Sequence, residues 1–174
     1  MNLLLIGLRG TGKSTAGRAT ADLLARPFID LDDRTSDVVG CDAPTCFREH
    51  GEPAWRAGEL IALKDVLGRH AHSIIALGGG TPTAPGAEAS LRLEREERRV
   101  RIGWLDATPE VLTRRIGDDP HRPALTDLPA LDEMKAIDLI RRPIFQRIAD
   151  QHIDVTDLGL AAVVGSLMAL ATRG

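Results

Sequence analysis

The chain is poor in the residues that staple small proteins or hold structural metals. It has two cysteines, Cys41 and Cys46, and they lack the paired spacing and the nearby histidines of a zinc site. The five histidines are scattered along the 174 residues and form no cluster. We therefore expect both cysteines to be reduced and to serve packing, and we expect no catalytic or metal site built on histidine.

An excess of positive charge is also missing. The net charge is -3 and the isoelectric point is near 5.9, so the sequence shows no electrostatic footprint for nucleic acid. The basic stretch 92–101 contains the i,i+4 pairs Glu94 with Arg98 and Glu97 with Arg101, which are typical of a solvated helix face. This balance favours a small metabolite as the partner and argues against nucleic acid.

No hydrophobic segment is long enough to span a bilayer. The most apolar stretch, residues 158–171, has the length of a buried terminal helix. The short apolar run 3–6 follows no basic segment and ends at Gly7, which indicates a strand and no signal peptide. We expect a cytoplasmic protein with no membrane association, and we expect it to be a monomer.

The most specific motif is a phosphate-binding loop, Gly7-Leu8-Arg9-Gly10-Thr11-Gly12-Lys13-Ser14. It stands between the strand-like run 3–6 and a helical pattern over residues 14–25. Its glycines let backbone N–H groups converge on phosphate oxygens, and the following helix points its positive end at the same anion. Lys13 supplies a point charge to the outer phosphates, and Ser14 can ligate Mg²⁺. The motif predicts a protein that binds a nucleoside triphosphate.

Strand-like runs recur along the chain, and helical patterns separate them. The runs cover residues 3–6, 28–30, 73–77, 100–105 and 152–155. Alternating strands and helices favour right-handed crossovers and a parallel sheet that is covered on both faces. The pattern predicts one α/β domain over residues 1–174, a three-layer α/β/α fold like that of P-loop nucleoside monophosphate kinases, with a central five-stranded parallel sheet.

Two segments interrupt this alternation. Residues 33–72, between the second and third runs, are long enough to form a substrate-binding lobe. Residues 116–128 lose the periodic pattern and contain Gly117, Pro120, Arg122 and Pro123. Such a loop is either a mobile lid or an inert surface connection, and we favour the lid because its arginine could reach a phosphate.

The acidic partner of Mg²⁺ is less obvious. The third run leads into Ala76-Leu77-Gly78-Gly79-Gly80, with no aspartate at its end. Asp30 and Asp32 flank Leu31 at the end of the second run, and we expect their side chains to point to opposite sides. One could reach the metal through water while the other faces a hydroxyl group of an acceptor. The alternative is that these carboxylates cap a helix or a turn, which suits Asp33 best.

In their order and spacing, these motifs resemble the shikimate kinase family over nearly the whole chain. The resemblance implies that ATP phosphorylates a hydroxyl of shikimate, giving shikimate 3-phosphate and ADP in the biosynthesis of chorismate and aromatic amino acids. Among the departures from the family pattern, Arg142 stands where a smaller residue is usual, and residues 154–157 offer no arginine for stacking on adenine. The resemblance rests on the phosphate loop, Asp30-Leu31-Asp32, Gly51-Glu52, Trp55-Arg56, Glu59, Gly78-Gly79-Gly80, Arg122-Pro123 and Arg141-Arg142-Pro143-Ile144-Phe145.

The resemblance also implies roles for individual residues. Shikimate would be bound at its hydroxyls by Asp32, at its carboxylate by Arg56 and Arg141, and through the backbone by Gly78, Gly79 and Gly80. Mg²⁺ would be held by Ser14 and, through water, by Asp30. The catalytic residues would be Lys13, Asp32 and Arg122, with Arg122 reaching the transferred phosphate. ATP would be bound by Gly10, Thr11, Gly12, Lys13, Ser14, Thr15, Arg122 and, near adenine, Arg115.

The chemistry of these residue types agrees with the implied roles. Two arginines can hold one carboxylate with planar, bidentate hydrogen bonds, and Glu59 could orient Arg56 across one helical turn. Phosphoryl transfer needs alignment and neutralisation of charge, which Lys13, Mg²⁺ and Arg122 would supply. Asp32 would position the acceptor hydroxyl and could accept its proton.

Two other functions are compatible with the phosphate loop. A kinase for gluconate or for a nucleoside monophosphate would share the loop and the lid but would need another acceptor pocket, and the paired arginines with Asp32 argue against it. A nucleotide switch without enzymatic activity would carry an Asn-Lys-x-Asp motif, which the sequence lacks.

Overall fold

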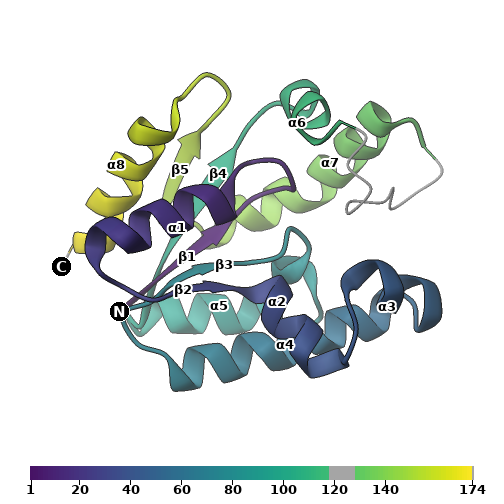
Figure 1. The fold of residues 1–174 in the computed structure, drawn as a ribbon, viewed down its shortest axis with the longest axis horizontal. Coiled ribbons are helices and arrows are strands. Elements are labelled where there is room, and N and C mark those ends of the chain that lie inside the picture. Colours follow the sequence, from purple (N-terminus) through teal and green to yellow (C-terminus); the bar gives the residue numbers. More distant parts are fainter. Residues whose placement is uncertain (118–127, 174) are drawn as a thin grey trace.

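The structure is a computed structural model, and it describes residues 1–117 and 128–173. Parallel strands form one five-stranded sheet in the order β2-β3-β1-β4-β5 (Figure 1). The strands match the five runs expected from the sequence to within one residue at each end, and the predicted α/β fold is confirmed. They are β1 (Asn2–Ile6), β2 (Phe28–Asp30), β3 (Ile74–Ala76), β4 (Val100–Asp106) and β5 (Gln151–Asp154).

Helices connect the strands, and three of them, α2, α3 and α4, make up the segment between β2 and β3. These three lie together on one side of the molecule in Figure 1, and α2 and α3 both pack on α4. The helices are α1 (Lys13–Leu24), α2 (Leu31–Val39), α3 (Ala43–Glu49), α4 (Glu52–Arg69), α5 (Ala87–Glu96), α6 (Pro109–Ile116), α7 (Ala130–Ile148) and α8 (Leu160–Thr172), with the short 3-10 helix η1 (Thr81–Thr83).

Two neighbouring residues of β4 show which helices cover which face of the sheet. A Cβ atom at Gly103 would lie 3.2 Å from a side-chain carbon of Leu167 in α8. The next residue, Trp104, packs on Phe145 of α7 with ring centroids 6.0 Å apart. Because successive residues of a strand face opposite sides, α8 and α7 cover opposite faces. Since α1 packs beside α8, the layers are helix, sheet, helix.

The core lies along the middle strands, which are buried on both faces. Leu3, Leu4, Leu5 and Ile6 of β1 are fully buried, as expected for a parallel strand between two helical layers. Parallel pairing with β3 and β4 brings the carboxyl ends of all strands to one edge, where the phosphate loop and residues 77–80 follow. In the described ranges, no helix has the length and apolarity needed to cross a membrane.

Two local expectations from the sequence are wrong. The expectation that Asp30 and Asp32 point to opposite sides of a strand fails, because residues two apart on a strand share one face. In addition, β2 ends at Asp30 and α2 begins at Leu31, so Asp32 lies in the first turn of a helix. Helix α5 ends at Glu96 and the chain turns at Arg98, which has a φ of 55°. The cation that pairs with Glu94 is therefore Arg99 and not the expected Arg98, and Arg99 also pairs with Glu97.

The packing of α4 against α2 distinguishes two glycines of one helix. A Cβ atom at Gly58 would lie 2.4 Å from Cγ1 of Val39, whereas a Cβ atom at Gly68 would meet nothing within 4 Å. We expect Gly68→Ala to raise the free energy of unfolding by about 0.5–1 kcal/mol, because alanine favours the helix. Gly58→Ala should gain the same helix propensity, but its methyl group would overlap Val39. Such overpacking costs about 1–3 kcal/mol, so the net stability should fall.

Urea unfolding of both variants measures these two changes. Stabilisation by Gly58→Ala equal to that by Gly68→Ala would show that α2 and α4 are not in close contact at this point.

Candidate active site

A cavity of about 470 Å³ opens at the carboxyl edge of the sheet, between the phosphate loop, α2, α4 and α7. It brings together most of the residues that the sequence singled out. Arg122 and most of the expected lid, 116–128, lie outside the described residues. The predicted site residues on the cavity wall are Gly10, Gly12, Lys13, Ser14, Thr15, Asp30, Asp32, Arg56, Gly79, Gly80, Arg115 and Arg141.

The phosphate loop joins the end of β1 to the start of α1. Gly12 caps this helix with a φ of 85°, a conformation that residues with a side chain rarely adopt, and as a glycine it provides no capping side chain for the first N–H groups of the helix. Nζ of Lys13 donates to the carbonyl oxygens of Gly7 and Leu8, each at 2.9 Å. Thr11 lies behind the wall, where its hydroxyl donates to the Leu8 carbonyl. This arrangement is suited to an anion at the helix terminus.

Ser14 and Asp30, the predicted metal ligands, lie together at the floor of the cavity. Oγ of Ser14 donates to Oδ2 of Asp30 at 2.7 Å, while Oδ1 of Asp30 accepts from the backbone N–H of Asp32 at 3.2 Å. Asp30 is thus both a helix cap and an available oxygen ligand. The described residues contain no cluster of three acidic, histidine or cysteine side chains that could hold a metal. A hydroxyl and one carboxylate fit Mg²⁺, which keeps several waters and takes few protein ligands.

Asp32 lies in the first turn of α2 and faces acidic neighbours. Water reaches it through the cavity, yet the surrounding protein raises its pKa from 3.8 to about 6. Burial is the largest cause, and repulsion by Asp30 and Glu59 adds to it, while Lys13 and Arg56 oppose the shift. Asp32 therefore titrates closer to neutrality than an ordinary aspartate.

The glycines after β3 let charged groups come close to the backbone. A Cβ atom at Gly78 would lie 2.4 Å from Oδ1 of Asp32 and 2.6 Å from Oε1 of Glu59. A Cβ atom at Gly80 would lie 2.3 Å from Cζ of Arg56. Gly78 does not line the cavity itself but leaves space for side chains that do. At both positions a residue larger than glycine would displace a charged side chain.

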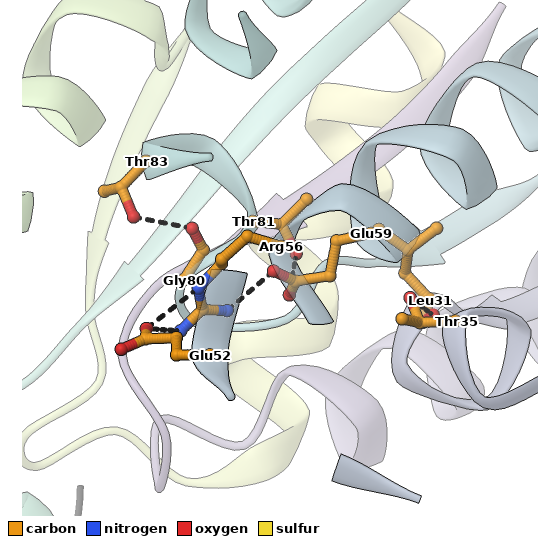
Figure 2. A network of polar contacts seen from close by, with 8 residues as sticks. All are labelled: Leu31, Thr35, Glu52, Arg56, Glu59, Gly80, Thr81 and Thr83. Atoms are coloured by element: carbon orange, nitrogen blue, oxygen red, sulfur yellow. Dashed lines mark hydrogen bonds and ion pairs between the residues drawn. The ribbon is translucent and has the colours of Figure 1, made fainter. Parts of the chain in front are cut away.

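Arg56 is held by two glutamates of its own helix, as Figure 2 shows. Its Nε and Nη2 donate to Oε1 of Glu52 at 3.0 and 2.6 Å, and its Nη1 donates to Oε2 of Glu59 at 2.6 Å. Glu59 is 1% exposed and also accepts from Oγ1 of Thr81 at 2.7 Å. The prediction that Glu59 orients Arg56 is confirmed, and Glu52 adds a second contact.

Arg141 differs from Arg56, because it forms no ion pair with any residue that the structure describes. It projects from α7 into the same cavity, near Gly79, whose Cβ would lie 3.4 Å from Nη1 of Arg141. Burial lowers the pKa of this guanidinium to about 10, and repulsion by Arg56 and Arg9 adds to the effect. Arg141 is therefore a desolvated cation in the cavity, and an anionic ligand could pair with it.

Arg115, which also lines the cavity, lies in the last turn of α6. Its Nη2 donates to the carbonyl oxygens of Val155 and Thr156, at 2.8 and 3.2 Å. The contact ties α6 to the loop that follows β5, the loop in which the sequence has no arginine.

Sequence reasoning missed one charged contact at this site. Arg9, inside the phosphate loop, pairs through Nη2 with Oε1 of Glu133 at the start of α7. Glu133 is 1% exposed, and Arg9 lines the cavity. Position 9 is variable in the motif, and Glu133 is distant from it in the sequence, so no local sequence pattern predicts this pair.

Comparisons with known proteins agree with one another. The family model for shikimate kinase matches residues 9–171. The shikimate kinase of Limosilactobacillus fermentum is 36% identical over 170 residues, covering 97% of this chain and 94% of that protein. That of Rhodopirellula baltica is 33% identical over 180 residues, covering 98% and 90%. The structure of a shikimate kinase from Acinetobacter baumannii in complex with shikimate has a TM-score of 0.87 and 27% identity, covering 97% of this chain and 91% of that one.

The raised pKa of Asp32 has a measurable effect on stability. Between its unfolded pKa near 3.8 and its folded pKa of about 6, the native state keeps the proton that the unfolded chain has lost. The stability that Asp32 contributes in acid is therefore lost as the pH rises through this window, and it stays constant above it. Because Asp32→Asn cannot titrate, we expect its free energy of unfolding, relative to wild type, to rise across the window and then level off.

Urea unfolding at a series of pH values measures this difference. Asp33→Asn, which removes an exposed carboxylate outside the cavity, controls for the loss of charge alone. A difference between Asp32→Asn and wild type that stays flat from about pH 4 to about pH 6 would refute the raised pKa.

Proposed function

The chain belongs to the shikimate kinase family, and we propose that its cavity is where ATP phosphorylates a hydroxyl of shikimate. The products are ADP and shikimate 3-phosphate, in the biosynthesis of chorismate and aromatic amino acids. The observation that carries this assignment is Arg141, a partly buried cation facing a phosphate loop with no acidic partner among the described residues. Among the residues that the structure describes, no contact in the cavity favours gluconate or a nucleoside monophosphate as the acceptor.

We assign the nucleotide to the side of the cavity formed by the phosphate loop and α6. The uncapped N–H groups at the start of α1, with Lys13 and Thr15, would bind the phosphates of ATP, and Arg115 would lie near adenine. Ser14 and, through water, Asp30 would hold Mg²⁺, which when bound neutralises phosphate charge and orients the outer phosphates. The hydrogen bond between Ser14 and Asp30 supports this pairing.

We assign shikimate to the side formed by α2, α4, α7 and residues 78–80. Arg141 and Arg56 would bind the carboxylate, and their separate origins on α7 and α4 suit a clamp from two directions. Asp32 would accept a hydrogen bond from the hydroxyl that is phosphorylated. With a pKa of about 6 it is mostly ionised at neutral pH, and it is basic enough to take the hydroxyl proton as transfer proceeds.

The transfer step requires that negative charge on the moving phosphoryl group be met by fixed positive charge. Lys13 lies on the cavity wall between the two proposed substrate positions and meets this need. The assignment of residues 33–72 as a substrate-binding lobe and of 116–128 as a lid, with Arg122 contacting the transferred phosphate, stays a prediction. So do a monomeric state and a cytoplasmic location.

Loss of Lys13 tests the nucleotide side. We expect Lys13→Met to lower kcat at least about 100-fold, because the cation acts on charge that grows in the transition state. The variant should still fold, with a lower thermal midpoint, because it loses the hydrogen bonds that Lys13 donates to Gly7 and Leu8. A coupled assay for ADP release measures kcat, and Lys64→Met on the exposed face of α4 is the control. Turnover in Lys13→Met equal to that of the control would exclude a catalytic role for the loop.

Arg56 and Arg141 should have like effects on shikimate and opposite effects on stability. Arg141→Met removes a desolvated cation while keeping the aliphatic stem, so the free energy of unfolding should rise by roughly 1–2 kcal/mol. Arg56→Met leaves the buried Glu59 without its cation, so the free energy of unfolding should fall by roughly 1–3 kcal/mol. Each variant should raise the KM for shikimate roughly 10- to 100-fold, because charge-assisted hydrogen bonds to the carboxylate are lost.

Thermal unfolding without ligands and steady-state kinetics measure the two effects. Shikimate methyl ester, which has no carboxylate charge, is the control acceptor, and the penalty for Arg141→Met should largely vanish with it. Equal penalties for shikimate and its ester would show that Arg141 does not bind the carboxylate.

A further inference from the structure

Arg142, the residue after Arg141 on α7, forms a clamp on the side away from the cavity. Its Nη1 and Nη2 donate to Oδ2 and Oδ1 of Asp106 at 2.7 and 2.9 Å, and its Nε donates to Oδ2 of Asp138 at 2.9 Å. The side chains of Asp106 and Asp138 are 11% and 15% exposed. A planar guanidinium that binds one carboxylate with both Nη atoms and a second with Nε has little freedom to rotate.

Two aromatic rings support this clamp from the sheet. The guanidinium carbon of Arg142 lies 5.2 Å from the ring centroid of Trp104, and the ring of His152 lies 4.3 Å from that of Trp104. Nε2 of His152 is 3.0 Å from Oδ2 of Asp106. Asp106 ends β4 and His152 lies in β5, so the contacts tie α7 to two neighbouring strands.

Arg141 has no comparable support. Among the described residues it forms no ion pair with a carboxylate, and repulsion by Arg56 and Arg9 opposes the more distant attraction of Glu52 and Glu59. Before an anionic acceptor arrives, its charge would be better solvated outside the cavity. Something other than its own contacts must hold its side chain in place.

The geometry of α7 links the two arginines. Neighbouring residues of an α-helix are about 100° apart around its axis, so fixing the direction of Arg142 also fixes that of Arg141. Pro143 lies inside α7 directly after them, and because it has no N–H, the carbonyl of Leu139 lacks its helical partner. The helix is thus intrinsically weakest beside Arg141, where an external clamp has the most effect.

We propose that Arg142 is a positioning residue for the acceptor: its clamp on Asp106 and Asp138 sets the rotation of α7 that keeps Arg141 in the cavity. Arg142 thereby determines the affinity for an acceptor with a carboxylate, without touching that acceptor. This inference rests on the proposed role of Arg141 in binding shikimate.

The test compares Arg142→Ala with a matched variant on the same helix. Arg147 also makes a bidentate ion pair from α7, to Glu88 of α5, with Nε and Nη2 at 2.7 and 3.0 Å, but it does not adjoin Arg141. Arg142→Ala should raise the KM for shikimate about 10-fold or more, with kcat and the KM for ATP within about 2-fold of wild type. Arg147→Ala should leave all three constants within about 2-fold.

Three further measurements separate positioning from a general loss of structure. The effect of Arg142→Ala should disappear with shikimate methyl ester, and it should also disappear in an Arg141→Met background, because the two residues act through one contact. Arg142→Lys should recover only part of the affinity, since an ammonium cannot bind Asp106 with two parallel hydrogen bonds. Should Arg142→Ala fail to fold, as judged by its thermal transition, Arg142→Lys and Asp138→Asn take its place in the same comparisons.

The outcomes distinguish this proposal from the function on which it rests. If Arg141→Met weakens shikimate use and Arg142→Ala does so additively, or equally with the ester, Arg142 is only structural and the proposal is wrong. An Arg147→Ala variant with the same KM increase would also overturn it. If Arg141→Met itself leaves the KM for shikimate unchanged, the assignment of the acceptor site fails first.

Discussion

The site depends on the close approach of charged side chains to a stretch of backbone that has no Cβ atoms. At Gly78, carboxylate oxygens of Asp32 and Glu59 occupy the space that a methyl group would need, and at Gly80 the guanidinium of Arg56 does so. Both carboxylates and a guanidinium pack against these glycines. The short loop after β3 therefore sets the spacing of the charged side chains that come from α2 and α4. The loop itself is anchored by its strand at the buried centre of the sheet.

Charge compensation around this loop is uneven, and in the proposed function this unevenness would favour an anionic acceptor. Arg56 is neutralised by Glu52 and Glu59, and Arg9 by Glu133. Among the described residues, Arg141 has no such partner, so an anion that enters on this side relieves an existing electrostatic cost. A neutral ligand would leave that cost in place. Under the proposed function, selectivity for a carboxylate would arise from this deficit in the free protein as well as from contacts with the bound acceptor.

The sequence predicted what depends on local pattern and missed what depends on tertiary contact. The five strands and the phosphate loop follow from apolar runs and glycine spacing, and the meeting of Ser14 with Asp30 follows from where strands end. The start of α2 at Leu31 was missed, because a capping aspartate ends a strand and begins a helix within one residue. The pairs Arg9 with Glu133 and Arg142 with Asp106 join residues far apart in the chain, and no local signal encodes them.

The strand order β2-β3-β1-β4-β5 divides the proposed site into two halves of different origin. Residues after β2 and β3 and on α4 face the proposed acceptor, whereas the phosphate loop after β1 and helix α6 after β4 face the proposed nucleotide. Changes on the first side can therefore accumulate during evolution without disturbing the machinery that handles ATP. Arg141 is the exception, because it reaches the acceptor half from a helix between β4 and β5. A lineage that exchanged its acceptor would therefore also have to alter one residue on the nucleotide side of the sheet.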